Sequence, residues 1–306
     1  MNLARAVARN VLFKGTGEIA VRLLSFAFIV FVARSLPEAE FGALNFAYAF
    51  PLLFVVIVDF GLAPLLVREA SRAPEAGPVV FHNLLLLKLA LGVLYAAAVF
   101  AGLQIAAPEA SFRRAGYLLA AFVLFNSFTE FVNAAFQARQ QMQYEAAVNA
   151  WQKLALLLLG LAAIGLGWGL PGVAGAYAAA GLLGLAAGFG VLAARGLMRG
   201  AWRFDRRFLG YALREALPLT LTTLFINLYF RIDMTLLTRL RPAEAVGWYG
   251  AAHKIIEVMM VVPAVLVAAS FPGLARLHTE DPARLERGAK KLLRLLTALA
   301  VPMAAG

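Results

Sequence analysis

The sequence predicts an all-α, polytopic membrane protein whose helices form two lobes. The 306-residue chain is 62% hydrophobic and only 15% charged, with a mean hydropathy of +0.78. Globular proteins are roughly 45–50% apolar and about 25% charged. Apolar runs of the roughly 20 residues needed to cross a bilayer recur along the whole chain. Features of the first half also recur in the second half, which predicts the two lobes.

The apolar runs predict eight full membrane spans and the start of a ninth. The spans are expected at 16–35, 42–66, 80–101, 115–137, 146–168, 171–195, 211–237 and 245–271, with the ninth starting near 289. Residues 1–15 are basic and amphipathic, which is typical of a helix lying on the membrane surface. The run at 23–33 follows Arg22 and has the length of the apolar region of a cleaved signal peptide, but Phe31 stands where a small residue is preferred. An uncleaved first span is therefore the preferred interpretation.

The distribution of positive charge predicts the orientation. Of the 28 Lys and Arg residues, 18 fall in alternate loops on one side, five fall on the other and five lie within spans. Cytoplasmic loops carry the excess of positive charge, so the N-terminus is expected in the cytoplasm. The net charge of +11 is explained in the same way, without a nucleic-acid partner. Contact with anionic membrane lipids is expected along the basic stretch between the sixth and seventh spans.

An internal repeat predicts the domain boundaries. Arg34-Ser-Leu-Pro37 followed by Gly42 recurs as Arg239-Leu-Arg-Pro242 followed by Gly247, each identity separated by the same offset of 205 residues. Repeated six-span units are a known plan of transporters. We therefore expect a six-helix lobe at 16–195, a basic cytoplasmic linker at 196–210 and a second lobe at 211–306. That second lobe is expected to be incomplete in this chain, by about four spans relative to the first.

Polar residues inside the spans predict a hydrated cavity. One helical face of the seventh span carries Thr220, Thr223, Asn227, Arg231, Thr235 and Thr238. Other spans carry Glu18, Arg22, Asp59, Lys88, Asn126, Glu130, Asn133, Lys153, Tyr249, His253, Lys254 and Glu257. A charge facing hydrocarbon costs several kcal/mol, so these groups should face a shared cavity. The alternatives are helix packing for single polar residues, snorkelling for Arg231, and structural ion pairs for Asp59 with Arg68 or another base and for Glu18 with Arg22.

Small residues inside the spans predict how the helices pack, and prolines inside the spans predict where the helices bend. Ala176, Ala180, Gly184 and Gly188 recur every four residues in the sixth span, which predicts a face that packs closely on its neighbours. Prolines at 51, 218 and 263 indicate kinks of the kind found in transporters and also in static bundles.

Several classes of chemistry are not indicated. The chain contains no cysteine, and its three histidines are scattered, so no metal site or thiol nucleophile is predicted. No nucleotide-binding or hydrolase motif occurs. The longest outward loop, near 102–114, is expected to have about a dozen residues, too few for an extramembrane catalytic domain. The sequence therefore predicts a protein that is not an enzyme and has no cofactor.

Two stretches resemble bacterial polysaccharide (O-antigen-type) flippases of the multidrug/oligosaccharidyl-lipid/polysaccharide exporter superfamily. The first, VARSLPEAEFGALNFAYAFPLLFVVIVDFGLAPLLVRE (32–69), carries Phe41-Gly42, Asp59-Phe60-Gly61-Leu62 and Arg68-Glu69. The second, RIDMTLLTRLRPAEAVGWYGAAHKIIEVMMVVPAVLVAASFPGLARL (231–277), carries Asp233, Gly247-Trp-Tyr249, Ala251-Ala252, Pro263 and Phe271-Pro272. The resemblance implies an exporter-type bundle of two six-helix lobes.

The resemblance also implies a function. It is the translocation of an undecaprenyl-diphosphate-linked oligosaccharide across the bacterial inner membrane by alternating access, for surface polysaccharide biosynthesis. The implied partners are that lipid-linked oligosaccharide, membrane lipids, and polysaccharide polymerase and chain-length machinery. The residues expected to bind substrate are Arg22, Lys88, Lys153, Asn227, Arg231, Tyr249 and Lys254, because a pyrophosphate needs cationic donors and sugars need aromatic and amide partners. Glu18, Asp59, Glu130 and Glu257 are candidates for coupling to H⁺ or Na⁺.

Four alternatives remain open at this point. A multidrug or cation antiporter and a peptidoglycan-precursor flippase belong to the same superfamily. Acidic and basic groups within the spans are equal in number, so charge does not exclude a cation exporter. A membrane enzyme acting on lipid-linked sugars is disfavoured by the short outward loops, and a nonfunctional fragment is the fourth alternative.

Overall fold

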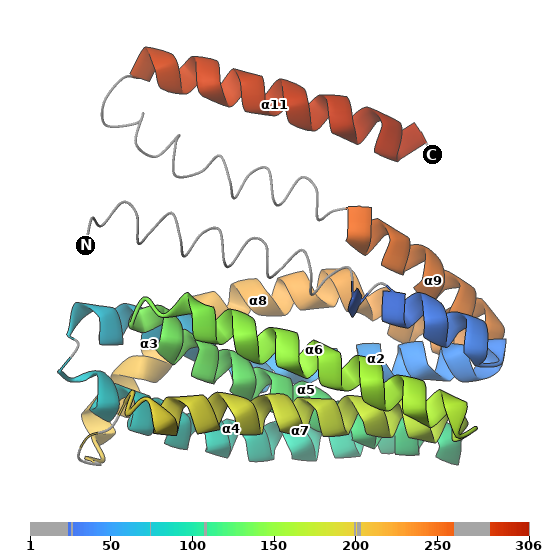
Figure 1. Ribbon diagram of the computed structural model, residues 1–306, viewed down its shortest axis with the longest axis horizontal. Coiled ribbons are helices and arrows are strands. Elements are labelled where there is room, and N and C mark those ends of the chain that lie inside the picture. Colours follow the sequence, from blue (N-terminus) through green and yellow to red (C-terminus); the bar gives the residue numbers. More distant parts are fainter. Residues whose placement is uncertain are drawn as a thin grey trace. The chain divides into compact units, whose positions relative to one another are not determined.

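The computed structural model describes residues 24–25, 27–73, 75–106, 109–198, 200, 203–259 and 282–305 (Figure 1). Within these ranges the regular structure is helical and no strand occurs, which confirms the predicted fold class. The chain divides into two compact units, Met1–Gly250 and Ala251–Gly306. The predicted surface helix at 1–15 lies outside the described residues, as does most of the first half of the predicted span at 16–35.

Five helical segments of the described part are long and apolar enough to cross a membrane. They are α2 with α3 (Glu38–Asp59 and Leu62–Arg72), α4 (Gly77–Ala106), α5 (Ala110–Ala138), α6 (Met142–Gly165) and α7 (Gly169–Ala194). They correspond to the second to sixth predicted spans. The protein is therefore a multi-pass helical membrane protein, as the composition predicts.

Three further helices follow: α8 (Arg206–Leu240), α9 (Ala243–Met259) and α11 (Pro282–Ala305). α8 covers the predicted seventh span and is long enough to cross a membrane. Its Thr, Asn, Arg and Asp residues make it more polar than the five apolar segments described above. α9 covers the first part of the predicted eighth span, and the rest of that span lies outside the described residues. α11 begins earlier than the predicted start near 289, with Pro282 in the first turn, where proline is well tolerated.

The connection between α4 and α5 is shorter than predicted. α4 extends to Ala106 and α5 begins at Ala110, so helix replaces most of the outward loop expected near 102–114. The predicted linker is tied to the first lobe, because the Asn83 side chain donates to the Arg203 carbonyl (2.6 Å) and accepts from the Asp205 amide (2.9 Å). Asp205 then caps α8 by accepting from the amides of its first turn.

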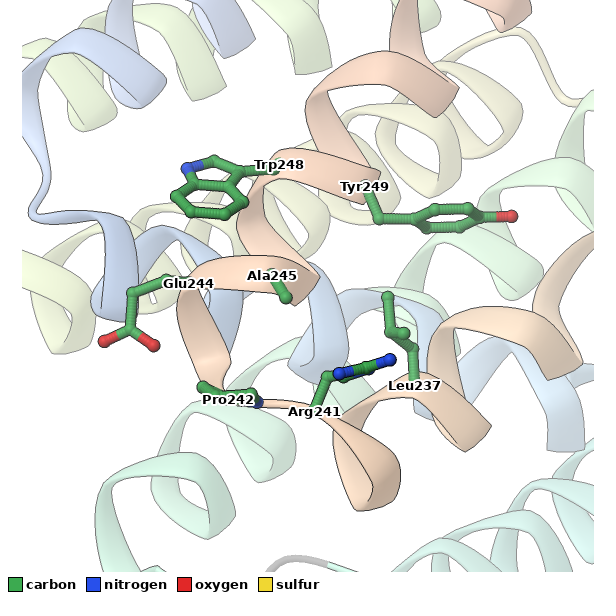
Figure 2. Close-up of a pocket in the computed structure, with 7 residues that line it drawn as sticks. All are labelled: Leu237, Arg241, Pro242, Glu244, Ala245, Trp248 and Tyr249. Carbon is green, nitrogen blue, oxygen red and sulfur yellow. The ribbon is translucent and has the colours of Figure 1, made fainter.

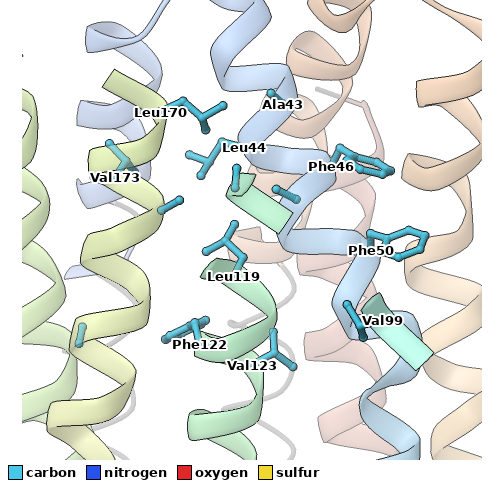
Figure 3. Packing of buried hydrophobic residues seen from close by; sticks show 14 of the residues in the cluster. Ala43, Leu44, Phe46, Phe50, Val99, Leu119, Phe122, Val123, Leu170 and Val173 are labelled. Atoms are coloured by element: carbon cyan, nitrogen blue, oxygen red, sulfur yellow. The ribbon is translucent and has the colours of Figure 1, made fainter. Parts of the chain in front are cut away.

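The apolar core of the first unit is built around α5. This helix packs on α7, α2 and α3. Figure 3 shows Leu119, Phe122 and Val123 of α5 among buried side chains of α2 and α7. Because lipid tails are as apolar as leucine, close packing rather than the hydrophobic effect holds such helices together.

Small residues on α7 allow this close packing. Ala176, Ala180, Gly181, Gly184 and Gly188 are all buried on the face that meets α5 and α6. A Cβ atom on Gly184 would lie 2.8 Å from Cγ of Gln152 on α6. The predicted small-residue packing face is therefore confirmed.

Candidate functional site

The second predicted span is interrupted where it carries Asp59. Phe60 and Gly61 both have left-handed backbone conformations, with φ of 35° and 61°, and they separate α2 from α3. Such a conformation is uncommon for a non-glycine residue and tends to occur at functional sites. The second predicted span, at 42–66, therefore lies within one apolar segment, Glu38–Arg72, which this break divides into α2 and α3. The prolines at 51 and 218, expected to kink their spans, both lie inside uninterrupted helices.

A buried lysine stabilises the end of α2. Lys88 of α4 is 1% exposed, and its Nζ donates to the Val58 carbonyl (3.0 Å), Asp59 Oδ1 (3.2 Å) and Ser127 Oγ (2.7 Å). Ser127 Oγ in turn donates to Asp59 Oδ1. An ammonium group has three donors, and all three have acceptors here. Lys88 therefore satisfies both a helix-end carbonyl and the carboxylate beside it.

A polar cavity of about 190 Å³ opens between α2 and α5 next to this ion pair. Its lining consists of Tyr48, Leu52, Val55, Asp59, Phe122, Val123, Asn126, Ser127 and Glu130. The Asp59 side chain is 40% exposed and faces this space, whereas Lys88 is covered on the other side by the rings of Phe128 and Phe131. The cavity is polar and large enough for several water molecules.

The side chains of this cavity suit proton exchange or binding of a small cation. Carboxylates, an amide and hydroxyl groups are the oxygen donors that hard cations prefer. The Lys88 ammonium pairs with Asp59, and Glu130 brings a second carboxylate to the cavity lining. No group of three or more His, Cys, Asp or Glu arranged to hold a metal ion occurs among the described residues.

A separate groove lies at the turn between α8 and α9. The groove has a volume of about 690 Å³. Figure 2 shows the residues that line it: Leu237, Arg241, Pro242, Glu244, Ala245, Trp248 and Tyr249. Trp248 is 64% exposed, and its Nε1 donates to Glu38 Oε2 (3.1 Å). The Tyr249 hydroxyl donates to the Asp233 carboxylate. Tyr249, predicted to bind sugar, therefore lies in this open groove and is not among the residues that line the cavity between α2 and α5.

Comparison with known proteins identifies the family. The sequence matches the model of the family described as "polysaccharide biosynthesis protein" over residues 7–278. The chain belongs to this family. No curated protein matches the sequence significantly.

The fold of this polysaccharide biosynthesis family member is also that of solved exporters. One similar structure is the inward-facing conformation of a multidrug resistance MATE family transporter of the MOP superfamily, with 15% identity, a TM-score of 0.70, and coverage of 95% of this chain and 72% of that one. Another is a ligand complex of the MATE multidrug transporter DinF-BH, with 15% identity, a TM-score of 0.70, and coverage of 99% and 72%. The predicted exporter-type bundle is thereby confirmed.

Three residues predicted for the site of this family member lie together. Lys88 of α4 pairs with Asp59 of α2 at the break, and Glu130 of α5 lines the same cavity as Asp59. Asp59 pairs with Lys88, whereas Arg68, the other partner considered for it, bonds to Glu69, Glu215 and Tyr211. Lys153 lies on α6, partly buried, and is not among the cavity-lining residues.

The other predicted residues lie partly or wholly beyond what the structure describes. Glu18 and Arg22 fall outside the described residues. The side chains of Asn227 and Arg231 on α8, and of Lys254 and Glu257 on α9, also lie outside the described part of the chain. Within the described part of the predicted α8 stripe, Thr220 and Thr238 donate to carbonyls one turn earlier in the helix.

Sequence reasoning missed Ser127 and Tyr48. Ser127 lies three residues before Glu130, so the helical spacing on α5 offered a signal that places both on one face. Tyr48 precedes Asp59 by eleven residues, about three turns of α2. Its place in the cavity depends on the packing of α2 against α5, which the sequence does not reveal.

Proposed function

We propose that this protein is a transporter that moves an undecaprenyl-diphosphate-linked oligosaccharide across the bacterial inner membrane by alternating access, for surface polysaccharide synthesis. The observation that carries the proposal is the broken helix α2–α3, which opens on a polar cavity inside an exporter fold. Membrane transporters bind substrates and ions where spanning helices are interrupted. Membership of a polysaccharide biosynthesis family supports the class of substrate. Nothing in this role requires an enzymatic step.

Recognition of the lipid-linked substrate requires cations for the diphosphate. Lys88 directs its donors to Val58, Asp59 and Ser127, so its role in this proposal is to hold the broken helix. Attraction of the diphosphate then falls to the other predicted bases, Arg22, Lys153, Arg231 and Lys254. Arginine offers a two-pronged donor that matches phosphate oxygens, and the lipid tail stays in the bilayer.

The coupling step is proposed to use the cavity between α2 and α5. Glu130 would exchange H⁺ or Na⁺, because the nearby Lys88 ammonium disfavours a second cation on Asp59. A change of charge at Glu130 would alter the field on the Lys88–Asp59 pair and therefore on the break. Occupancy of the cavity would in this way be linked to the conformation of α2 and α3.

Gene deletion with complementation tests the proposal. We expect the deletion strain to accumulate lipid-linked glycan on the cytoplasmic leaflet and to lose surface polysaccharide, both restored by the wild-type gene. Glu130→Gln should not restore export although it reaches wild-type abundance, whereas Glu109→Gln, at the exposed start of α5, should restore it. Normal surface polysaccharide in the deletion strain would refute the proposed function.

A multidrug exporter is the second candidate function. The similar DinF-BH structure is that of a multidrug transporter, and the cavity here combines two carboxylates with Tyr48 and Phe122. Such a lining also suits an organic cation. If this alternative holds, the deletion strain becomes sensitive to lipophilic cationic dyes while its surface polysaccharide stays normal.

A further inference from the structure

We infer that Gly42 and Gly247, the two glycines related by the internal repeat, form a reversible seal between the lobes at their predicted outward ends. The inference rests on the proposed alternating access, because it names the contact that would have to part on one side of the membrane. It concerns α2 and the part of α9 up to Gly250, which lie in one compact unit.

The backbones of α2 and α9 touch at this point. A Cβ atom on Gly247 would lie 3.0 Å from the Glu38 carbonyl oxygen, 3.4 Å from the Gly42 amide nitrogen and 3.6 Å from Gly42 Cα. A contact of 3.0–3.4 Å is tighter than nine in ten real Cβ contacts, so a side chain here would require the backbone at Glu38 to shift by a few tenths of an ångström. The absence of side chains at both positions is what permits the approach.

A second pair of residues repeats the arrangement one turn further along. A Cβ atom on Gly250 would lie 2.6 Å from Cγ of Asn45, and these two positions have the same offset of 205 residues as Gly42 and Gly247. The Asn45 side chain is itself fixed, since Nδ2 donates to the Phe41 carbonyl (3.0 Å). When equivalent positions of two repeats meet each other, the contact lies on the axis that relates them.

A contact on that axis would hold the two repeats together at the end where it lies. Behind it, Ala49, Met234 and Val246 form a small buried cluster that joins α2, α8 and α9. Trp248 adds a hydrogen bond to Glu38 at the rim. This cluster is far smaller than the two large cores, one of which includes Ala212 and Ala216 near the start of α8.

The fold is known in more than one conformation. Solved structures similar to this chain include an inward-facing MATE family transporter and MATE in the bent conformation, with TM-scores of 0.70 and 0.59. The glycine contact joins α2 and α9 at the end that carries the start of α2 and the α8–α9 turn. Opening that end would require α2 to part from α8 as well as from α9 near the glycines, while the two large cores contain no described residue of α9.

Cysteine pairs test the closed contact directly, because the natural chain contains no cysteine. In the purified full chain in nanodiscs, Asn45→Cys with Gly250→Cys should form a disulfide on oxidation, read as lost modification by a maleimide polymer. The Gly250 Cβ position is close enough to Asn45 for the required Cβ–Cβ separation of about 3.5–4.5 Å. The control pair, Asn45→Cys with Gly190→Cys, should not form one, since nothing lies within 4 Å of a Cβ on Gly190.

Labelling kinetics test whether the contact opens. Ala49→Cys, buried behind the seal, should react with maleimide at least about tenfold more slowly than exposed Glu244→Cys, because the open state is a minority of about 10% or less. Gly247→Leu should raise the Ala49→Cys rate severalfold, and the smaller Gly247→Ala should raise it less. Gly190→Leu should leave the rate unchanged.

Two results would overturn the seal. One is absence of the Asn45–Gly250 disulfide in protein that elutes as folded. The other is an Ala49→Cys rate that equals that of Glu244→Cys or does not change with either Gly247 variant. Neither measurement uses a glycan, so failure of the proposed substrate would appear only in the deletion strain and would leave these results standing.

Discussion

At the scale of single residues, Lys88 is the group on which the candidate site depends. The sequence places a lysine at bilayer depth and predicts that it faces water or protein, but not which. The structure buries its side chain and directs its donors to Val58, Asp59 and Ser127. A charge with no partner in such a place would be expensive, so the pair with Asp59 is what makes the lysine tolerable.

Replacement of Lys88 should destabilise the protein. Lys88→Met leaves the Asp59 carboxylate and the Val58 carbonyl without their donor, and breaking a buried pair costs roughly 3–5 kcal/mol. Because Asp59 is 40% exposed, the lower end of that range is expected. Thermal unfolding in detergent measures the loss.

The double variant Lys88→Met with Asp59→Asn provides the control. Removing the second charge should recover a large part of the stability lost in Lys88→Met, since no unpaired ion remains. If the double variant is no more stable than Lys88→Met, the ion pair does not hold the break. Lys153→Met, on the partly buried face of α6, should have a smaller effect.

At the scale of the helices, the decisive feature is the break between α2 and α3. Apolar runs located the spans, because the length of a run reflects the thickness of the bilayer. They could not reveal the break, since Phe60 and Gly61 interrupt the helix through backbone torsions and without a proline. Asp59-Phe60-Gly61-Leu62 was singled out because it resembles a motif of the polysaccharide flippases. The left-handed conformation of Phe60 and Gly61 is visible only in the structure.

A side chain at Gly61 should strain the break. Gly61 has a φ of 61°, where β-branched residues are strongly disfavoured, so Gly61→Val should cost about 1–3 kcal/mol of stability. Gly175→Val on α7 is the matched control, because a Cβ there meets nothing within 4 Å. Thermal unfolding compares the two, and equal losses would show that the torsion at Gly61 is not under strain.

At the scale of the whole molecule, the orientation in the membrane remains a prediction. The excess of Lys and Arg in alternate loops places the N-terminus and the linker at 196–210 in the cytoplasm. The connections before α2, between α6 and α7, and between α8 and α9 are then outward. The proposed seal lies beside the connection before α2 and the connection between α8 and α9. Its predicted place on the outward side therefore depends on this orientation.

Single cysteines can test the orientation. In intact cells, an impermeant maleimide should label Ser35→Cys, before α2, and Gly167→Cys, between α6 and α7. It should label Gly200→Cys in the linker only after the membrane is permeabilised. Labelling of Gly200→Cys in intact cells would reverse the orientation and move the proposed seal to the cytoplasmic side.

The sequence by itself determined that the protein lies in a membrane, where its spans approximately fall, that it contains a repeat, and which family it belongs to. These are properties of composition and of residues near one another in the chain, so hydropathy and spacing report them directly. Tertiary structure alone decided that Lys88 meets Asp59, that α2 breaks at Phe60 and that Gly42 touches Gly247. Each of these depends on how helices distant in the sequence pack against each other, which no local pattern encodes.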